Sequence, residues 1–265
     1  METISVTHLL NQGAILMAQG RFKDGFECTR LGMAQIVQVF EATTTTDPSA
    51  SSSSSSIKPD LRAAPLGGRM PQQETSPTMA FVYPFLVDTC NVYTSWNMII
   101  PVALYNMALA HHRELLDLKR RRRTRSASSS SSSSSLDHQG NQQQQERLLL
   151  GTLRDMYRQA LAAWEHVFCN SDSNDSLRLP DESLLLVHLA ILNNLIHVEQ
   201  QFITSSSRDN NQAIVLELQQ EFCQAFLQLT HAESDPFFQH FDRIFVLCED
   251  GSEQTTTSNR AAAAA

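Results

Sequence analysis

Residues 153–161 read LRDMYRQAL, and residues 218–226 repeat the same order of residue types as LQQEFCQAF. Each copy places an aromatic residue four positions after Leu, Ala three positions further on, and an apolar residue directly after that Ala. Spacings of three and four put these side chains on one face of an α-helix. The repeat therefore predicts two helices that bury equivalent faces, with Ala160 and Ala225 as equivalent close-packing points.

Helical periodicity extends outward from this repeat through most of the chain. We predict helices at residues 7–19, 22–40, 101–119, 146–168 and 182–202, another from Asp209, and a short last one at 235–248. Gly20 separates the first two, which suits a hairpin, and Pro101 suits the first position of the third. The predicted fold class is all-α, with about seven helices arranged as antiparallel hairpins.

One ordered stretch does not have helical character. Residues 80–88 are rich in aromatic and β-branched residues, among them Phe81, Tyr83 and Val87, and Pro84 lies in their middle. Such composition favours an extended segment laid against the helices.

Low-complexity stretches divide the chain. We predict an N-terminal helical hairpin over residues 1–42 and helical repeats over residues 79–248. Runs of Ser, Thr and Gln, which bury too little apolar surface to offset the cost of ordering, predict disordered inserts at 43–78 and 122–145 and a disordered tail at 249–265.

The N-terminal pair and the internal repeat resemble the tetratricopeptide repeat, a helix hairpin that stacks on its neighbours. The residues that carry the resemblance in the first pair are small, apolar, turn and aromatic residues in the order of that motif: Gly13, Leu16, Gly20, Phe22, Gly25 and Gly32. Ala108 and Ala190 take the place of Gly13 in two later helices. The signature Trp and the closing Pro of the motif are absent. The resemblance implies stacked hairpins and a protein-binding surface.

A second resemblance is to a large set of diatom proteins that combine four short motifs with low-complexity inserts. In this chain the motifs are Gly20-Arg21-Phe22, YNMALAHH at residues 105–112, Asn193-Asn194-Leu195 and Phe237-Phe238. The resemblance implies a shared architecture and carries no activity with it.

Composition and targeting signals bear on where the protein acts. The formal net charge is −8, and the five cysteines stand singly, which favours reduced thiols and a cytoplasmic or nuclear location. The N-terminus lacks the pattern of a signal peptide, and no apolar run reaches the length of a membrane span, so we expect no membrane association.

The motifs of common enzyme classes are missing. There is no HExxH, no GxSxG and no Gly-rich phosphate loop, and the adjacent His111 and His112 would point about 100° apart on a helix. We therefore predict a protein that is not an enzyme, with no catalytic residues, no metal and no cofactor. A small enzyme of unfamiliar type is the least favoured of the alternatives.

A protein-interaction or scaffold role is the favoured function. Among the positions that would line the inner face of stacked hairpins, Tyr105, His112, Arg113 and Asn194 combine hydrogen-bonding capacity with that location, and we predict that they contact a protein partner. Most other inner positions are apolar. Either the groove binds an apolar peptide face, or another part of the chain, such as the segment at 80–87 or the last helix, covers it.

The rival function is that of a nuclear or RNA-associated regulatory protein. It would act through a basic run next to a Ser-rich insert: Lys119, Arg120, Arg121, Arg122, Arg123 and Arg125. The acidic remainder of the chain disfavours nucleic-acid binding elsewhere. The simpler interpretation is a solvated helix end that is favoured by the negative C-terminal dipole.

Overall fold

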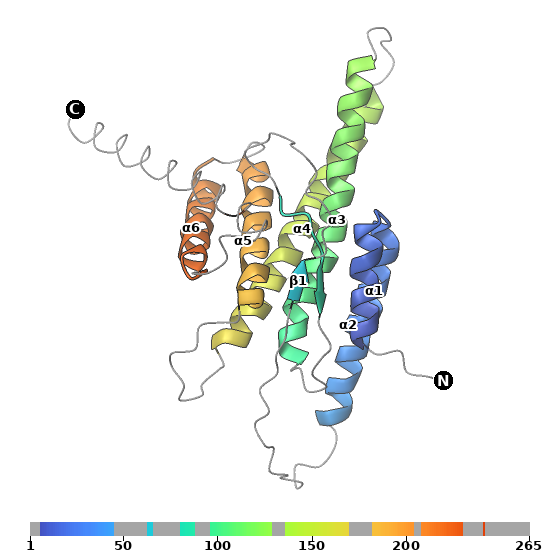
Figure 1. Ribbon diagram of the computed structural model, residues 1–265. Helices are drawn as coiled ribbons and strands as arrows, with labels where there is room; N and C mark the ends of the chain where they lie inside the picture. The colour runs from blue at the N-terminus through green and yellow to red at the C-terminus, as the bar shows by residue number, and fades with distance from the viewer. Residues whose placement is uncertain are drawn as a thin grey trace, which may run out of the picture. The chain divides into compact units, whose positions relative to one another are not determined.

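The computed structural model describes residues 6–44, 63–65, 80–87, 96–128, 136–169, 182–203, 208–229 and 241. Its helices are α1 (Val6–Ala18), α2 (Phe22–Thr44), α3 (Trp96–Ser128), α4 (Leu136–Cys169), α5 (Glu182–Ile203) and α6 (Arg208–Phe226) (Figure 1). Two short strands, β1 (Ala63–Pro65) and β2 (Phe85–Val87), pair with each other. The predicted all-α class is confirmed for the described part of the chain.

The elements fall into two units. Unit 1 consists of Met1–Arg69 and Val82–Asp172, and unit 2 consists of Met70–Phe81 and Ser173–Ala265. In unit 1, α1 packs on α2, α2 on α3 and α3 on α4, while β2 lies against α1 and α3. In unit 2, α5 packs on α6.

The turn between α1 and α2 depends on Gly20. This residue has a positive φ of 81°, which glycine adopts without strain. The N–H of Gly20 donates to the carbonyl of Met17 at 3.0 Å, and the N–H of Arg21 donates to that of Leu16 at 2.9 Å. These two bonds form a Schellman motif, which satisfies the last carbonyls of α1 and reverses the chain into α2. The predicted hairpin is therefore present.

Helices α1 and α2 approach each other so closely near Gly13 and Gly25 that their backbones are in contact. A Cβ atom added at Gly13 would lie 2.3 Å from the Thr29 hydroxyl and 2.8 Å from the carbonyl oxygen of Gly25. A Cβ at Gly25 would likewise lie 2.8 Å from the carbonyl oxygen of Gly13. Only the absence of side chains at both positions permits this separation of the two helices.

The core of unit 1 lies between α1, α3, α4 and β2. Its largest fully buried side chains include Leu10, Phe85, Tyr105, Leu115 and Tyr157. Ala160, on the buried face of α4, has no exposed surface. This burial agrees with the close-packing role that the sequence repeat predicts for it.

Unit 2 contains α5, most of whose described residues between Leu185 and Glu199 are buried. The described rings of Phe81 and Phe241 stack with centroids 5.0 Å apart, and Phe241 also contacts Phe222 at 6.0 Å. His188 Nε2 lies 3.0 Å from Glu221 Oε1 and so connects α5 to α6. Ala225 is buried, as predicted for the second copy of the repeat.

Several boundaries differ from the prediction. α3 begins at Trp96, so Pro101 lies in the second turn and not at the first position, and its missing N–H removes one backbone hydrogen bond. α3 continues to Ser128 and α4 begins at Leu136, although residues 122–145 were predicted to lack structure. Arg and Gln are strong helix formers, and pairing with a neighbouring helix outweighs the low-complexity signal.

Other predictions concern parts of the chain of which the structure describes few residues. Within the predicted insert at 43–78, the structure describes the end of α2 at Thr44 and strand β1, and the extended segment near 80–88 contains β2. Of the predicted last helix at 235–248, only Phe241 is described. The tail at 249–265 lies outside the described residues.

Candidate functional site

Both edges of β2 are occupied in unit 1. On one edge β1 pairs antiparallel with it, and Leu86 stands opposite Ala64. Successive residues of a strand turn their backbone groups to opposite edges, so Phe85 and Val87 present theirs to the other side. There α1 and α3 lie against the strand, and their side chains make the hydrogen bonds that a neighbouring strand would otherwise make.

Asn106 of α3 holds the backbone of Phe85 at two points. Its Oδ1 accepts a hydrogen bond from the N–H of Phe85 at 2.9 Å, and its Nδ2 donates to the carbonyl of Phe85 at 2.8 Å. Asn106 is 1% exposed and Phe85 is fully buried. Because a primary amide carries both an acceptor and donors, a single side chain satisfies both backbone groups of one residue.

Asn11 of α1 makes the same pair of bonds with Val87. Its Oδ1 accepts from the N–H of Val87 at 2.7 Å, and its Nδ2 donates to the carbonyl of Val87 at 2.8 Å. Asn11 precedes Gly13 by two residues, and Asn106 precedes Ala108 by two. The two helices thus make the same pair of contacts with one extended segment, each from the second residue before a small one.

The contacts follow the two-residue period of an extended chain. The hydroxyl of Tyr105 donates to the carbonyl of Tyr83 at 3.3 Å. Residues 83, 85 and 87 are therefore all held through their backbones by side chains of α1 and α3. Pro84, which has no N–H, falls at an intervening position where these contacts require no donor.

Side chains of the segment are bound as well as its backbone. The Phe85 ring meets Tyr105 edge to face, with ring centroids 5.3 Å apart. Val87 is 2% exposed, whereas Leu86 between them is only partly buried. The site therefore accepts an aromatic residue and, two positions later, an aliphatic one.

Unit 2 contains a further pairing of the same kind. Asn194 of α5 accepts a hydrogen bond from the N–H of Phe81 at 2.7 Å and donates to its carbonyl at 2.9 Å. Both residues are fully buried. Asn194, which the sequence predicts as a partner contact, is thus engaged with a residue of its own chain.

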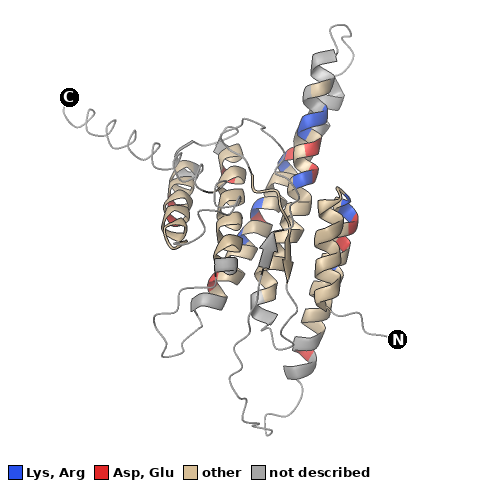
Figure 2. Cartoon of the chain, in the orientation of Figure 1, with Lys and Arg blue, Asp and Glu red and all other residues tan. Residues whose placement is uncertain are grey.

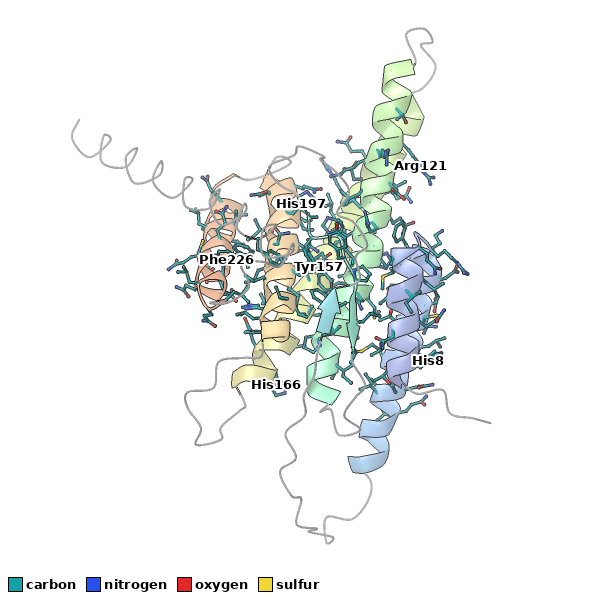
Figure 3. All side chains as sticks on the ribbon, in the orientation of Figure 1. His8, Arg121, Tyr157, His166, His197 and Phe226 are labelled. Atoms are coloured by element: carbon teal, nitrogen blue, oxygen red, sulfur yellow. The ribbon has the colours of Figure 1, made fainter. Side chains whose placement is uncertain are left out.

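The predicted contacts Tyr105 and His112 meet around Tyr157 in the core of unit 1. His112 Nδ1 and the hydroxyl of Tyr157 are hydrogen-bonded at 3.0 Å, and the ring centroids of the two residues are 5.8 Å apart. The Tyr105 and Tyr157 ring centroids are 6.2 Å apart. All three residues are buried; Figure 3 labels Tyr157 on α4. Their visible role is to support the side of α3 that faces β2.

Arg113, the fourth predicted contact, is partly exposed. Its guanidinium carbon lies 5.7 Å from the centroid of the Phe22 ring, which is a cation–π arrangement. Burial raises the pKa of the Tyr83 phenol above its usual value of about 10, and the positive charge of Arg113 partly offsets that rise. Arg113 is thus electrostatically coupled to the extended segment.

The basic run begins on the outer half of α3. Lys119 Nζ forms an ion pair with Glu146 Oε1 of α4 at 3.3 Å, while Arg120 and Arg121 are exposed. Acidic and basic residues are interspersed along this part of the α3–α4 hairpin (Figure 2), and Figure 3 labels Arg121. The side chains of Arg122, Arg123 and Arg125 are outside the described set.

A surface pocket of about 680 Å³ lies beside Arg121, between α2 and α3. Its lining carries both signs of charge: Arg21, Lys23 and Arg121 are basic, and Asp24, Glu27, Glu114 and Asp117 are acidic. Arg21 and Asp24 form an ion pair with each other at 2.8 Å. A lining of mixed charge lacks the uniformly positive character that a phosphate backbone requires.

Asn11 and Asn106 are not among the residues that the sequence predicts as partner contacts. The available signal was their identical position, two residues before the small residues Gly13 and Ala108 that the repeat aligns. That signal identifies equivalent positions but does not reveal which segment lies against them.

Within the described residues, no group of three or more His, Cys, Asp and Glu side chains is placed to hold a metal ion. None of the helices described is both long enough and apolar enough to cross a membrane. No protein-family model, curated protein or solved structure matches the chain.

Proposed function

We propose that this chain is a protein-interaction or scaffold protein that uses its helical hairpins to hold an extended polypeptide segment. One observation carries the proposal. Asn11 and Asn106 come from equivalent positions of α1 and α3, and each bonds both backbone groups of one residue in an extended segment. Recognition through the backbone is the way in which proteins commonly bind extended peptides.

The packing order of the helices supports a tetratricopeptide-like stack in unit 1. Each helix there packs on the next one in sequence, which is typical of stacked hairpins. The close approach of Gly13 to Gly25 supports the same arrangement, because these are the positions where the repeat resemblance expects small residues. Such stacks present concave surfaces to other chains.

The four predicted partner contacts have distinct parts in this proposal. Tyr105 positions the bound segment through its hydroxyl. His112 is hydrogen-bonded to Tyr157, whose ring lies against the ring of Tyr105. Arg113 is the residue that is open to a partner directly. Asn194 would hold the segment of unit 2 in the way that Asn106 holds β2.

The experiment is affinity purification of the full chain after nuclease treatment, followed by reconstitution with the purified partner. We expect at least one protein to bind directly and to bind at least tenfold more weakly to the Asn11→Ala, Asn106→Ala variant. The matched control is Gln12→Ala, Gln159→Ala, which removes two amides from exposed positions of α1 and α4. Equal affinity of all three proteins, with folding confirmed by circular dichroism, would contradict the proposal.

A second candidate function rests on the exposure of Arg120 and Arg121 at the start of the basic run. In that case the run would direct nuclear import or contact RNA, and the helices would only hold it. Retention of RNA rather than protein in the same purification would favour this alternative.

A further inference from the structure

We infer that the edge formed by Asn11 and Asn106 is a docking site for an extended segment of a partner protein, with an aromatic residue followed two positions later by a β-branched aliphatic residue. Residues 83–87 of the chain itself are the resident occupant, which the partner segment replaces. The inference rests on the proposed function and specifies its ligand and its regulation.

The contacts of the two asparagines are transferable from one chain to another. All four hydrogen bonds end on the N–H and carbonyl groups of Phe85 and Val87, and none ends on a side chain of the segment. Any residue except proline supplies the same two groups. An incoming segment therefore restores every one of these bonds, provided that neither of its two bound positions is proline.

Selectivity comes from the side chains that the site encloses. The ring of Phe85 is buried against Tyr105, and Val87 is buried two positions later. Leu86 is partly exposed, so the position between them places a weak constraint on a partner. The stated pattern of an aromatic and a β-branched aliphatic residue follows from these two enclosed positions.

The resident segment lies outside the helices, so its departure from the site breaks no helical hydrogen bond. The resident segment belongs to the link of residues 45–95 between the end of α2 and the start of α3. Because the segment is covalently joined to its site, a competing peptide meets it at an effective concentration on the order of 1 mM. A peptide with an intrinsic dissociation constant of ~10 μM would therefore bind the intact chain about 100-fold more weakly than a chain whose site is vacant.

The direct test uses the fluorescently labelled peptide VYPFLVD, which is residues 82–88 of this chain, as the probe. The site is vacated in the full-length protein by Phe85→Asp together with Val87→Asp, because two buried carboxylates expel the resident segment. The control Gln12→Asp with Gln159→Asp adds the same charge at exposed positions. We expect the vacated variant to bind the probe at least tenfold more tightly than the control or the wild type.

Adding Asn11→Ala and Asn106→Ala to the vacated variant should abolish that binding. A folded vacated variant that does not bind the probe would overturn the inference. A second result would also overturn it: the wild type forms a dimer as its concentration rises, and the Asn11→Ala, Asn106→Ala variant does not. The site would then bind a second copy of the chain.

If the vacated variant does not fold, hydrogen exchange on the wild type decides the question. Local release of the segment would let the amides of Phe85 and Val87 exchange at least tenfold faster than the amide of the core residue Tyr105. Equal rates with equal dependence on denaturant would show that the segment leaves only on unfolding, and would overturn the inference. If the vacated variant did not bind the probe while the wild type still bound a partner protein directly, only this inference would be refuted. If no protein bound the wild type directly, the proposed function would be refuted.

Discussion

Asn106 and Phe85 are separated by 21 residues in the chain, yet one side chain satisfies both backbone groups of the other residue inside the core of unit 1. An interaction of this kind is costly to remove, because a buried N–H or carbonyl that loses its partner retains the penalty of having left water. Stability measurements on Asn106 should therefore be sensitive to this contact.

Replacing Asn106 by Leu keeps the number and branching of the side-chain heavy atoms and removes the hydrogen-bonding atoms. We expect the free energy of unfolding to fall by about 2–4 kcal/mol, since two buried backbone groups lose their partners. Urea denaturation followed by circular dichroism measures the change. Gln159→Leu, at an exposed site on α4, is the control and should change stability by less than about 0.5 kcal/mol.

Gly13→Ala tests the close approach of α1 and α2. Alanine has the better helix propensity by about 1 kcal/mol, but its Cβ would meet the Gly25 carbonyl oxygen at 2.8 Å, and a backbone atom cannot rotate away. Overpacking of this kind costs about 1–3 kcal/mol and should outweigh the gain.

The matched substitution is Gly151→Ala on α4, where an added Cβ meets no heavy atom within 4 Å. Here the gain in helix propensity is unopposed, so the melting temperature should rise by a few degrees, from about 0.5–1 kcal/mol. Opposite signs for the two glycines are the expected result. If Gly13→Ala also stabilised the protein, the helices would be further apart than described.

Ala160→Leu and Ala225→Leu test the internal repeat. Both alanines are buried, and each follows a fully buried aromatic residue, Tyr157 or Phe222, by three positions. Each substitution should overpack its interface and lower the free energy of unfolding by about 1–3 kcal/mol. Unchanged thermal melting of both variants would show that the repeat has no structural meaning.

The raised pKa of Tyr83 predicts that the protein loses stability at alkaline pH. Its pKa is raised in the folded protein by burial, so the folded state retains the phenolic proton that the unfolded state loses above about pH 10. Below that pH both states are protonated, and stability is unaffected by this group. As pH rises from about 10 through the folded-state pKa, the free energy of unfolding should fall, and Tyr83→Phe should reduce that fall in denaturation curves measured at pH 9 to 11.

The basic run separates the two proposed functions. Replacing its six cations by Gln removes the charge while leaving good helix formers in α3. If the run is a solvated helix end, nuclear import and RNA retention should stay within twofold of the wild type while partner binding is kept. Loss of either import or RNA retention, with partner binding unchanged, would assign an independent role to the run.

The local features of the fold could be predicted from the sequence. The hairpin at Gly20, the buried faces around Ala160 and Ala225, and the extended character of residues 85–87 each depend on residues close together in the chain. Helix ends were less accurate where Arg- and Gln-rich segments continue α3 and α4, because support from a neighbouring helix does not appear in local composition.

The site could not be predicted to the same extent. Asn11 and Val87 are 76 residues apart, and no periodicity relates a helix to the segment that lies across it. Tyr105 was selected for its hydroxyl, which does reach the extended segment, but the two amides that hold β2 in unit 1 resembled ordinary polar residues on helix surfaces. Long-range pairing, rather than residue type, distinguishes them.

The amide contacts on β2 also bear on aggregation. A strand with an open edge offers unpaired N–H and carbonyl groups to any other strand and can template intermolecular sheets. The sequence of β2, Phe-Leu-Val, is apolar and rich in strand-forming character, which makes such an edge hazardous. Asn11 and Asn106 cover one edge while β1 covers the other, and neither asparagine can extend a sheet. The two residues therefore end the sheet at β2 and block sheet growth between molecules from that edge.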